Sequence, residues 1–188
     1  MWSSRELALV ILIAVTGVAY STLIYQIAQL VTGIPGLNYV LIVGMAIWIS
    51  LAFLIFEGRR WRVFLTAMIL VLITIPTYVM GPPFELGTRW PAMINAVLID
   101  IIGNSFYRYF KSKDRLIIWG ILSTLGFVYL DALLRMIMYP LFLPMEYISS
   151  YIWITIILSP VIIIETSVGG YFGYKIYQRV KKILSSVE

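Results

Sequence analysis

The chain contains no cysteine and no histidine. Without cysteine it can form neither a disulfide framework nor a thiolate metal site. Without histidine it lacks the most common general base and the imidazole ligands that bind haem iron, copper or zinc. No phosphate-binding loop of the Walker type occurs either, so ATP-driven work would require another subunit to bind the ATP. These absences weigh against most classes of enzyme and metalloprotein, and we expect no cofactor and no metal.

Charged residues are also scarce. Only 12% of the 188 residues are charged and 61% are hydrophobic, whereas a soluble domain keeps about 25% charged residues. The composition therefore predicts a protein whose solvent is lipid. Residues 1–6 are followed by about 25 mostly apolar residues without a small-residue cleavage site, which is typical of a first membrane span rather than a signal peptide.

Long apolar stretches divide the whole chain. A spanning helix needs roughly 20 apolar residues, and six such stretches occur, at about 7–31, 39–56, 63–80, 89–110, 116–139 and 149–178. No hydrophilic stretch is long enough for a second domain. The sequence predicts an all-α integral membrane protein, a single six-transmembrane-helix bundle formed by residues 1–188.

The distribution of cations predicts the orientation of these spans. Of the 14 lysines and arginines, only Arg89 and Arg135 fall toward the side that the other twelve avoid. Because positive charge collects on the cytoplasmic side, we expect both termini to be cytoplasmic and the loops at 32–38, 81–88 and 140–148 to face outward. The net charge of +5 therefore indicates contact with the membrane surface and not with nucleic acid. The protein is expected to be a multi-pass protein of the cell membrane. The twelve cations are Arg5, Arg59, Arg60, Arg62, Arg108, Lys111, Lys113, Arg115, Lys175, Arg179, Lys181 and Lys182.

A pair of opposite charges lies in the fifth span. Asp131 and Arg135 are four residues apart, so they share one helical face and are able to pair. Arg135 lies about 28 Å along this span from its cytoplasmic end, at a rise of 1.5 Å per residue, which places it near the outer surface and close to Arg89. Two interpretations remain open: a structural ion pair that closes the bundle, or a polar anchor for a ligand that enters from outside.

Two further carboxylates are expected inside the membrane. Asp100 lies about 16 Å below the outer end of the fourth span, on a polar stripe with Asn95 and Asn104, and Glu165 is expected at a similar or slightly greater depth in the sixth. Ionisable side chains at membrane depth are costly and often mark a site. Interhelical hydrogen bonds to Asn, Thr or Tyr are the favoured interpretation, and a proton relay is the alternative.

Small residues mark two helix-packing surfaces. Gly169 and Gly173 have the small-xxx-small spacing that lets helix backbones approach closely. Gly17 and Ser21, with Ala14 nearby, form a looser version in the first span. Such surfaces serve either the bundle itself or a partner protein, and the spacing alone does not distinguish the two.

Three stretches resemble a known family. "VGGYFGYKIYQRVKK" at the C-terminal end, "WPAMINAVLIDIIGNSFYRYFKSKDR" and "IIWGILSTLGFVYLDALLRMIMYPLFLP" resemble the sixth, fourth and fifth spans of the substrate-binding S component of energy-coupling factor (ECF) vitamin transporters. The resemblance covers the last hundred or so residues and follows general pattern rather than a strict motif. It implies a high-affinity membrane protein that binds a vitamin-like small molecule, together with a transmembrane coupling subunit and ATPase subunits as partners.

The resemblance also implies where the ligand binds. In that family the pocket lies in the outer half, among spans four to six and under the outer loops. The corresponding candidates are Arg89, Trp90, Asp131, Arg135, Tyr139 and Glu85. Two arginines would favour an anionic group on the ligand. In the family the first span often carries small residues that dock on the coupling subunit, and Gly17 and Ser21 approximate them here.

Two other functions compete with this interpretation. A non-catalytic structural subunit of a larger membrane complex would share the aromatic, methionine-rich helices. A membrane enzyme would need a paired-carboxylate mechanism, for which only Asp100 and Glu165 are available. Retention of a small molecule by the protein purified alone would distinguish a binding protein from the structural subunit.

Overall fold

The computed structural model describes residues 3–32, 42–77, 79, 84, 86–87, 89–142 and 144–185, and within these ranges every regular element is a helix. The described helices are α1 (Ser4–Thr32), α2 (Val43–Ile55), α3 (Arg62–Thr74), α4 (Trp90–Ser112), α5 (Leu116–Met138), the short 3-10 helix η2 (Tyr139–Leu141) and α6 (Met145–Ser185). The all-helical prediction is confirmed.

Three of these helices are long and apolar enough to cross a membrane. Their candidate spans are Ser4–Leu23 in α1, Leu116–Leu141 in α5 with η2, and Ile148–Lys182 in α6. Helices α2 and α3 are apolar but contain only 13 residues each, or about 20 Å at 1.5 Å per residue. That length is less than the roughly 30 Å of a hydrocarbon core. The composition and these three helices indicate a membrane protein.

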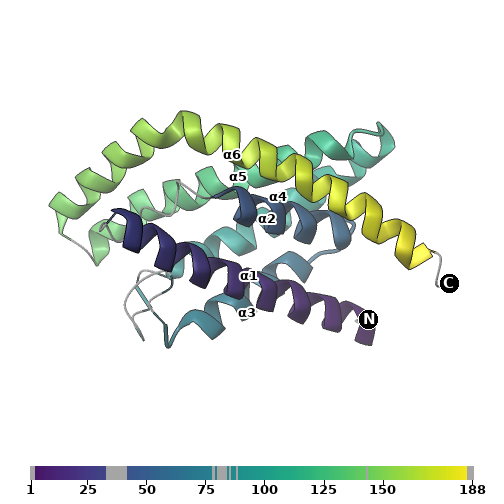
Figure 1. Ribbon diagram of the computed structural model, residues 1–188, viewed down its shortest axis with the longest axis horizontal. Coiled ribbons are helices and arrows are strands. Elements are labelled where there is room, and N and C mark those ends of the chain that lie inside the picture. The colour runs from purple at the N-terminus through teal and green to yellow at the C-terminus, as the bar shows by residue number, and fades with distance from the viewer. Residues whose placement is uncertain are drawn as a thin grey trace.

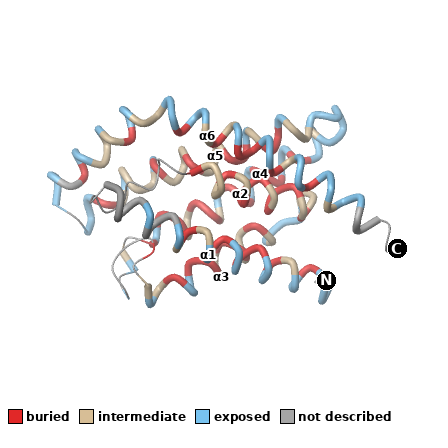
Figure 2. Tube along the Cα trace, viewed as in Figure 1, coloured by how far each residue is buried: buried red, intermediate tan, exposed pale blue. Residues whose placement is uncertain are grey.

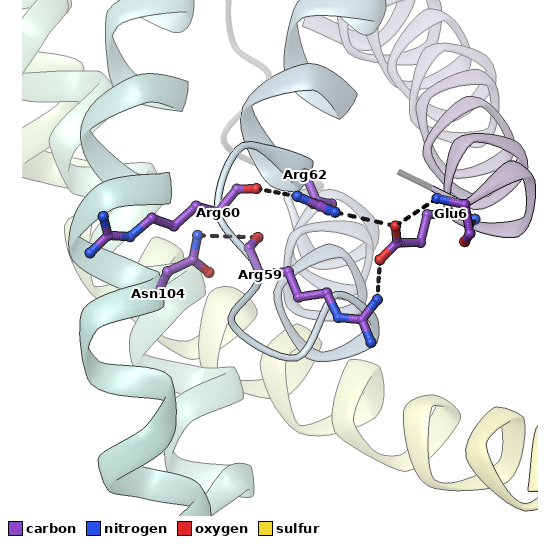
Figure 3. Close-up of polar contacts among 6 residues, drawn as sticks. Glu6, Arg59, Arg60, Arg62 and Asn104 are labelled. Atoms are coloured by element: carbon purple, nitrogen blue, oxygen red, sulfur yellow. Dashed lines mark hydrogen bonds and ion pairs between the residues drawn. The ribbon is translucent and has the colours of Figure 1, made fainter. Parts of the chain in front are cut away.

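Charged residues of four segments meet at one end of the molecule. These segments are the start of α1, the turn between α2 and α3 with the start of α3, the end of α4 and the end of α6 (Figure 1). Glu6 in α1 accepts hydrogen bonds from Arg59 and Arg62 in the turn between α2 and α3 and at the start of α3 (Figure 3). Glu57 in the same turn forms ion pairs of 3.7 Å each with Lys111 of α4 and Lys181 of α6. We call this the basic end, and the other the opposite end.

Helix α6 packs closely on α2 and α5 because it has glycines at the crossing. A Cβ atom added at Gly169 would lie 2.5 Å from the Val43 carbonyl oxygen, and one at Gly173 would lie 2.6 Å from the Ser50 Cβ. A Cβ at Gly170, on the adjacent side, would lie 2.8 Å from the Ile121 Cα. These glycines therefore serve the bundle itself, which settles the alternative that their spacing left open.

The small residues of α1 also face inward. A Cβ atom added at Gly17 would lie 2.6 Å from the ring of Trp48 in α2, and Ala14 and Ser21 are buried on the same side. The Trp48 indole N–H donates to the Ile13 carbonyl oxygen, which fixes this contact. The expectation that Gly17 and Ser21 dock on a coupling subunit is corrected, because the bundle already covers them.

The first half of α6 is less covered than the second. Pro160 lies inside α6, where proline removes a backbone hydrogen bond and bends a helix, and the helix follows an arched course over α5 (Figure 1). Buried positions lie along the inner faces of the helices, whereas much of α6 near the opposite end is exposed or intermediate (Figure 2). The arch thus separates a tightly packed region of α6, around Gly169, from a loosely covered one.

Candidate functional site

Asp131 and Arg135 of α5 and Tyr139, the first residue of η2, follow one another at four-residue intervals near the opposite end. The Arg135 Nε donates to Asp131 Oδ2 at 2.7 Å, and its Nη1 donates to the hydroxyl of Tyr139. The guanidinium carbon also lies 5.6 Å from the centre of the Tyr139 ring, within the range of a cation–π contact. The spacing of four residues predicted the ion pair, and the structure contains it.

This pair is only partly buried. The side chains of Arg135 and Asp131 are 13% and 18% exposed. Both belong to α5, so their mutual bond does not tie one helix to another. The ion pair itself therefore lies within α5, and its neighbour Tyr139 contacts α6 through the ring of Tyr151.

Helix α6 presents a polar stripe to this part of α5. Tyr151, Thr155 and Ser159 recur every four residues in an otherwise apolar segment. The Tyr151 ring packs against Tyr139 with 5.7 Å between centroids, and the Ser159 Oγ lies 2.7 Å from the Tyr129 hydroxyl. Sequence reasoning missed Tyr129, Tyr151 and Ser159, although the four-residue recurrence in α6 was a signal that could have identified two of them.

Asn95 of α4 is a further polar residue near the Asp131–Arg135 pair. It is fully buried, and its Nδ2 donates to the Phe127 carbonyl oxygen of α5 at 3.0 Å. Its Oδ1 is buried and accepts no hydrogen bond from any part of the chain that the structure describes. Phe127 precedes Asp131 by one helical turn, so Asn95 approaches α5 next to the charged pair. An unused buried acceptor costs roughly 1–3 kcal/mol, which a donor group on a ligand would recover.

Arg89 lies directly before α4, at the end of the fourth span where the sequence predicted it, and its guanidinium bonds to backbone groups. It is fully buried, and its Nη2 donates to the carbonyl oxygens of Thr74, Thr77 and Val79 at 3.2, 3.0 and 3.2 Å. Its positive charge therefore lies at the C-terminal end of α3, where the last carbonyls have no partner within the helix and the helix dipole favours a cation. Arg89 thus bonds to the end of another helix, whereas the ion pair of Arg135 is with Asp131 of its own helix.

The other predicted ligand-binding residues do not all lie near Arg135. Trp90 is 47% exposed, and Tyr139 is buried beside Arg135. Glu85 lies outside the described residues, as do the loop at 33–41 and most of the one at 80–88. Among the predicted ligand-binding residues, the structure therefore brings together Asp131, Arg135 and Tyr139.

Asp100 binds the N-terminal end of α3. Its Oδ2 accepts the Phe64 N–H at 3.3 Å, and its Oδ1 accepts a hydrogen bond from Asn104 one turn further along α4. Asn104 also donates to the Arg59 carbonyl oxygen at 3.4 Å (Figure 3). Phe64 is the third residue of α3, so its N–H is one of those without an intrahelical partner. Asp100 and Arg89 thus hold the two ends of α3 from the same neighbouring helix.

Glu165 does the same for α2. Its Oε2 accepts the N–H of Ile42, the residue before α2, at 2.8 Å. Asp100 acts beside the turn at residues 56–61 and Glu165 at the far end of α2, about 20 Å away for a 13-residue helix. The expectation of a similar or slightly greater depth for Glu165 therefore does not hold, because each carboxylate is placed by the helix end that it caps.

The distance between Asp100 and Glu165 bears on the enzyme alternative, which needs the two carboxylates to act together. Two carboxylates that bind opposite ends of one helical hairpin cannot act on the same bond, so the Asp100–Glu165 pair considered for an enzyme is not assembled. Among the described residues no group of three acidic residues is placed to hold a metal ion. The polar side chains near Asp131 can hold a molecule by hydrogen bonds and charge.

Comparison of the chain with protein families, curated proteins and solved structures found no match.

Proposed function

We propose that this protein is the membrane-embedded substrate-binding subunit of a small-molecule uptake transporter of the ECF type. The observation that carries the proposal is the Asp131–Arg135 pair, which lies within a single helix and away from the cations of the basic end. Charged side chains at membrane depth are retained where they serve a site. The ion pair between Asp131 and Arg135 lies within one helix, and we propose that it is retained because it serves a ligand site.

The surroundings of the pair support a ligand with an anionic group. An arginine guanidinium presents several N–H donors to a carboxylate or phosphate, and Asp131 holds that of Arg135 in position through one bond of 2.7 Å. Tyr139 and Tyr151 offer aromatic faces, and Asn95 offers a buried acceptor. Small-molecule sites combine apolar walls with a few such convergent polar groups.

The proposal places the protein across the cell membrane in six spans with both termini in the cytoplasm. Gathering of the charged segments at the basic end supports that orientation. Cysteine introduced at Ser112 or Ser185 should then react only with membrane-permeant thiol reagents, whereas cysteine at Gly87 should react from outside in intact cells. Labelling of Ser112→Cys by an impermeant reagent would overturn this orientation.

The uptake reaction would need partners. The chain lacks a Walker loop, so energy would come from ATPase subunits through a transmembrane coupling subunit. Because the small residues of α1 face inward, the coupling subunit would dock on the apolar outer face of this helix instead. That face includes Ile11, Leu12 and Val15, which are 53%, 60% and 48% exposed.

Native mass spectrometry of the protein purified alone tests the proposal. We expect a small molecule to remain bound and to be lost from Arg135→Ala but not from the exposed-surface control Arg108→Ala. Purification with other membrane subunits and without any small molecule would instead favour a non-catalytic structural subunit.

A further inference from the structure

A hollow lies at the basic end, between the last turns of α6 and the start of α5. Its volume is about 620 Å³, and its lining includes Leu116, Tyr174, Lys175, Arg179, Lys181 and Lys182. Four of the lining residues are cations and none is acidic. Such a composition favours an anion.

Glu57 is an acidic residue that bonds to two residues of this lining. It pairs with Lys181 at 3.7 Å and accepts a hydrogen bond from the Tyr177 hydroxyl at 3.2 Å. Glu57 also pairs with Lys111 outside the hollow. One carboxylate therefore offsets part of the charge of Lys181, and Lys175 and Arg179 lie on the exposed side of α6.

An apolar surface leads directly into this hollow along α6. Ile164, Val168 and Phe172 are 64%, 41% and 49% exposed and follow one another at four-residue intervals. Lys175 and Arg179 continue the same face, since positions 3 or 4 residues apart share one side of a helix. The ammonium of Lys175 lies 5.5 Å from the ring centre of Tyr171, so the change from apolar to cationic surface occurs within one turn.

We propose that this hollow binds the phosphate headgroup of an anionic phospholipid whose acyl chains lie along Ile164, Val168 and Phe172. Cations between helices at a membrane surface recognise anionic headgroups, and aromatic side chains at that level are typical of the interface. The exposed apolar face is the reason to assign a lipid rather than a soluble phosphate. This inference does not depend on the proposed transport function, because it concerns the other end of the molecule.

Lipid binding to the purified full-length protein tests the assignment. The detergent-solubilised protein is titrated with phosphatidylglycerol and the bound lipid is measured by native mass spectrometry. We expect Lys175→Gln/Arg179→Gln to raise the dissociation constant roughly 30-fold, since each cation near a headgroup contributes about 1 kcal/mol. The matched control Arg108→Gln/Lys113→Gln removes the same two charges from exposed positions of the basic end outside the hollow and should change the constant less than threefold.

Two further probes separate the headgroup from the tails. Phosphatidylcholine has the same acyl chains without net charge, and glycerol 1-phosphate has the anionic group without chains. We expect both to bind at least tenfold more weakly than phosphatidylglycerol. Equal losses in the two double variants, or equal binding of glycerol 1-phosphate and phosphatidylglycerol, would overturn the assignment. Equal melting temperatures of both variants without lipid would show that their folds are intact.

Discussion

The two arginines outside the basic end have opposite relations to the fold. Arg89 is fully buried and donates to three carbonyl oxygens at the end of α3. Arg135 is partly exposed and bonds to Asp131 and Tyr139 on its own stretch of chain. Arg89 connects the start of α4 to the end of α3, whereas the ion pair of Arg135 lies within α5. The contrast teaches that a cation bonded to the end of another helix serves the fold, whereas a cation paired within its own helix is the stronger candidate for a site.

The largest effect is expected when Arg89, the arginine that serves the fold, is replaced. Arg89→Met leaves the carbonyls of Thr74, Thr77 and Val79 without their charged donor, and a buried polar group left unpaired costs roughly 1–3 kcal/mol. We expect a loss of unfolding free energy of at least about 3 kcal/mol, measured by denaturant titration in detergent micelles. Arg135→Met is the matched control, because it makes the same chemical change and should cost less than about 1 kcal/mol. Equal losses in the two variants would remove the distinction between the arginines.

The second effect tests the other end of α3. Asp100→Ala removes the acceptor for the Phe64 N–H and leaves Asn104 without its bond to the carboxylate. Loss of such a helix-terminal acceptor costs about 1–2 kcal/mol, and we expect a lower melting temperature by several degrees. Asp100→Asn keeps an oxygen that accepts the same N–H and should retain more than half of the lost stability. If Asp100→Asn melts as low as Asp100→Ala, the carboxylate has a role other than capping α3.

The smallest effect is expected for the pair itself. A double-mutant cycle of Asp131→Asn and Arg135→Gln in the ligand-free protein should give a coupling energy below about 1 kcal/mol, as for other pairs within one helix. If the pair were structural and buried, each single change would instead cost roughly 3–5 kcal/mol and the double change would restore much of it. Denaturant titration of the four proteins distinguishes these outcomes.

Much of the fold follows from local features of the sequence. Low charge and long apolar stretches predict the helices, and the four-residue spacing predicts the Asp131–Arg135 bond. The ends of α3 and α6 were harder to place: α3 ends at Thr74, before Pro76, whereas α6 continues from Met145 to Ser185 through Pro160. A proline either ends a helix or bends it. Which of the two occurs depends on tertiary contacts, which the local sequence does not contain.

The roles of Arg89, Asp100 and Glu165 could not be predicted in the same way. Apart from the bond between Asp100 and Asn104, the partners described above are backbone groups at the ends of helices, and a backbone N–H or carbonyl carries no sequence signature. A search for polar side chains as partners therefore favoured Asn, Thr and Tyr, whereas Glu165 bonds to the N–H of Ile42, 123 residues away. The turn that orients α3 also depends on left-handed backbone at Glu57 and Trp61, with φ of 49° and 70°, which sequence patterns for these residue types do not predict.

The most direct test of the account asks whether Arg135 serves a ligand and not the fold. The melting temperature of wild-type protein and of Arg135→Ala is measured with and without the small molecule that native mass spectrometry identifies. A ligand stabilises only the state that binds it, so we predict that Arg135→Ala melts nearly as the wild type does without ligand and shows no shift with it. A variant that melts much lower without ligand and still gains the full wild-type shift would contradict the account and make the pair structural.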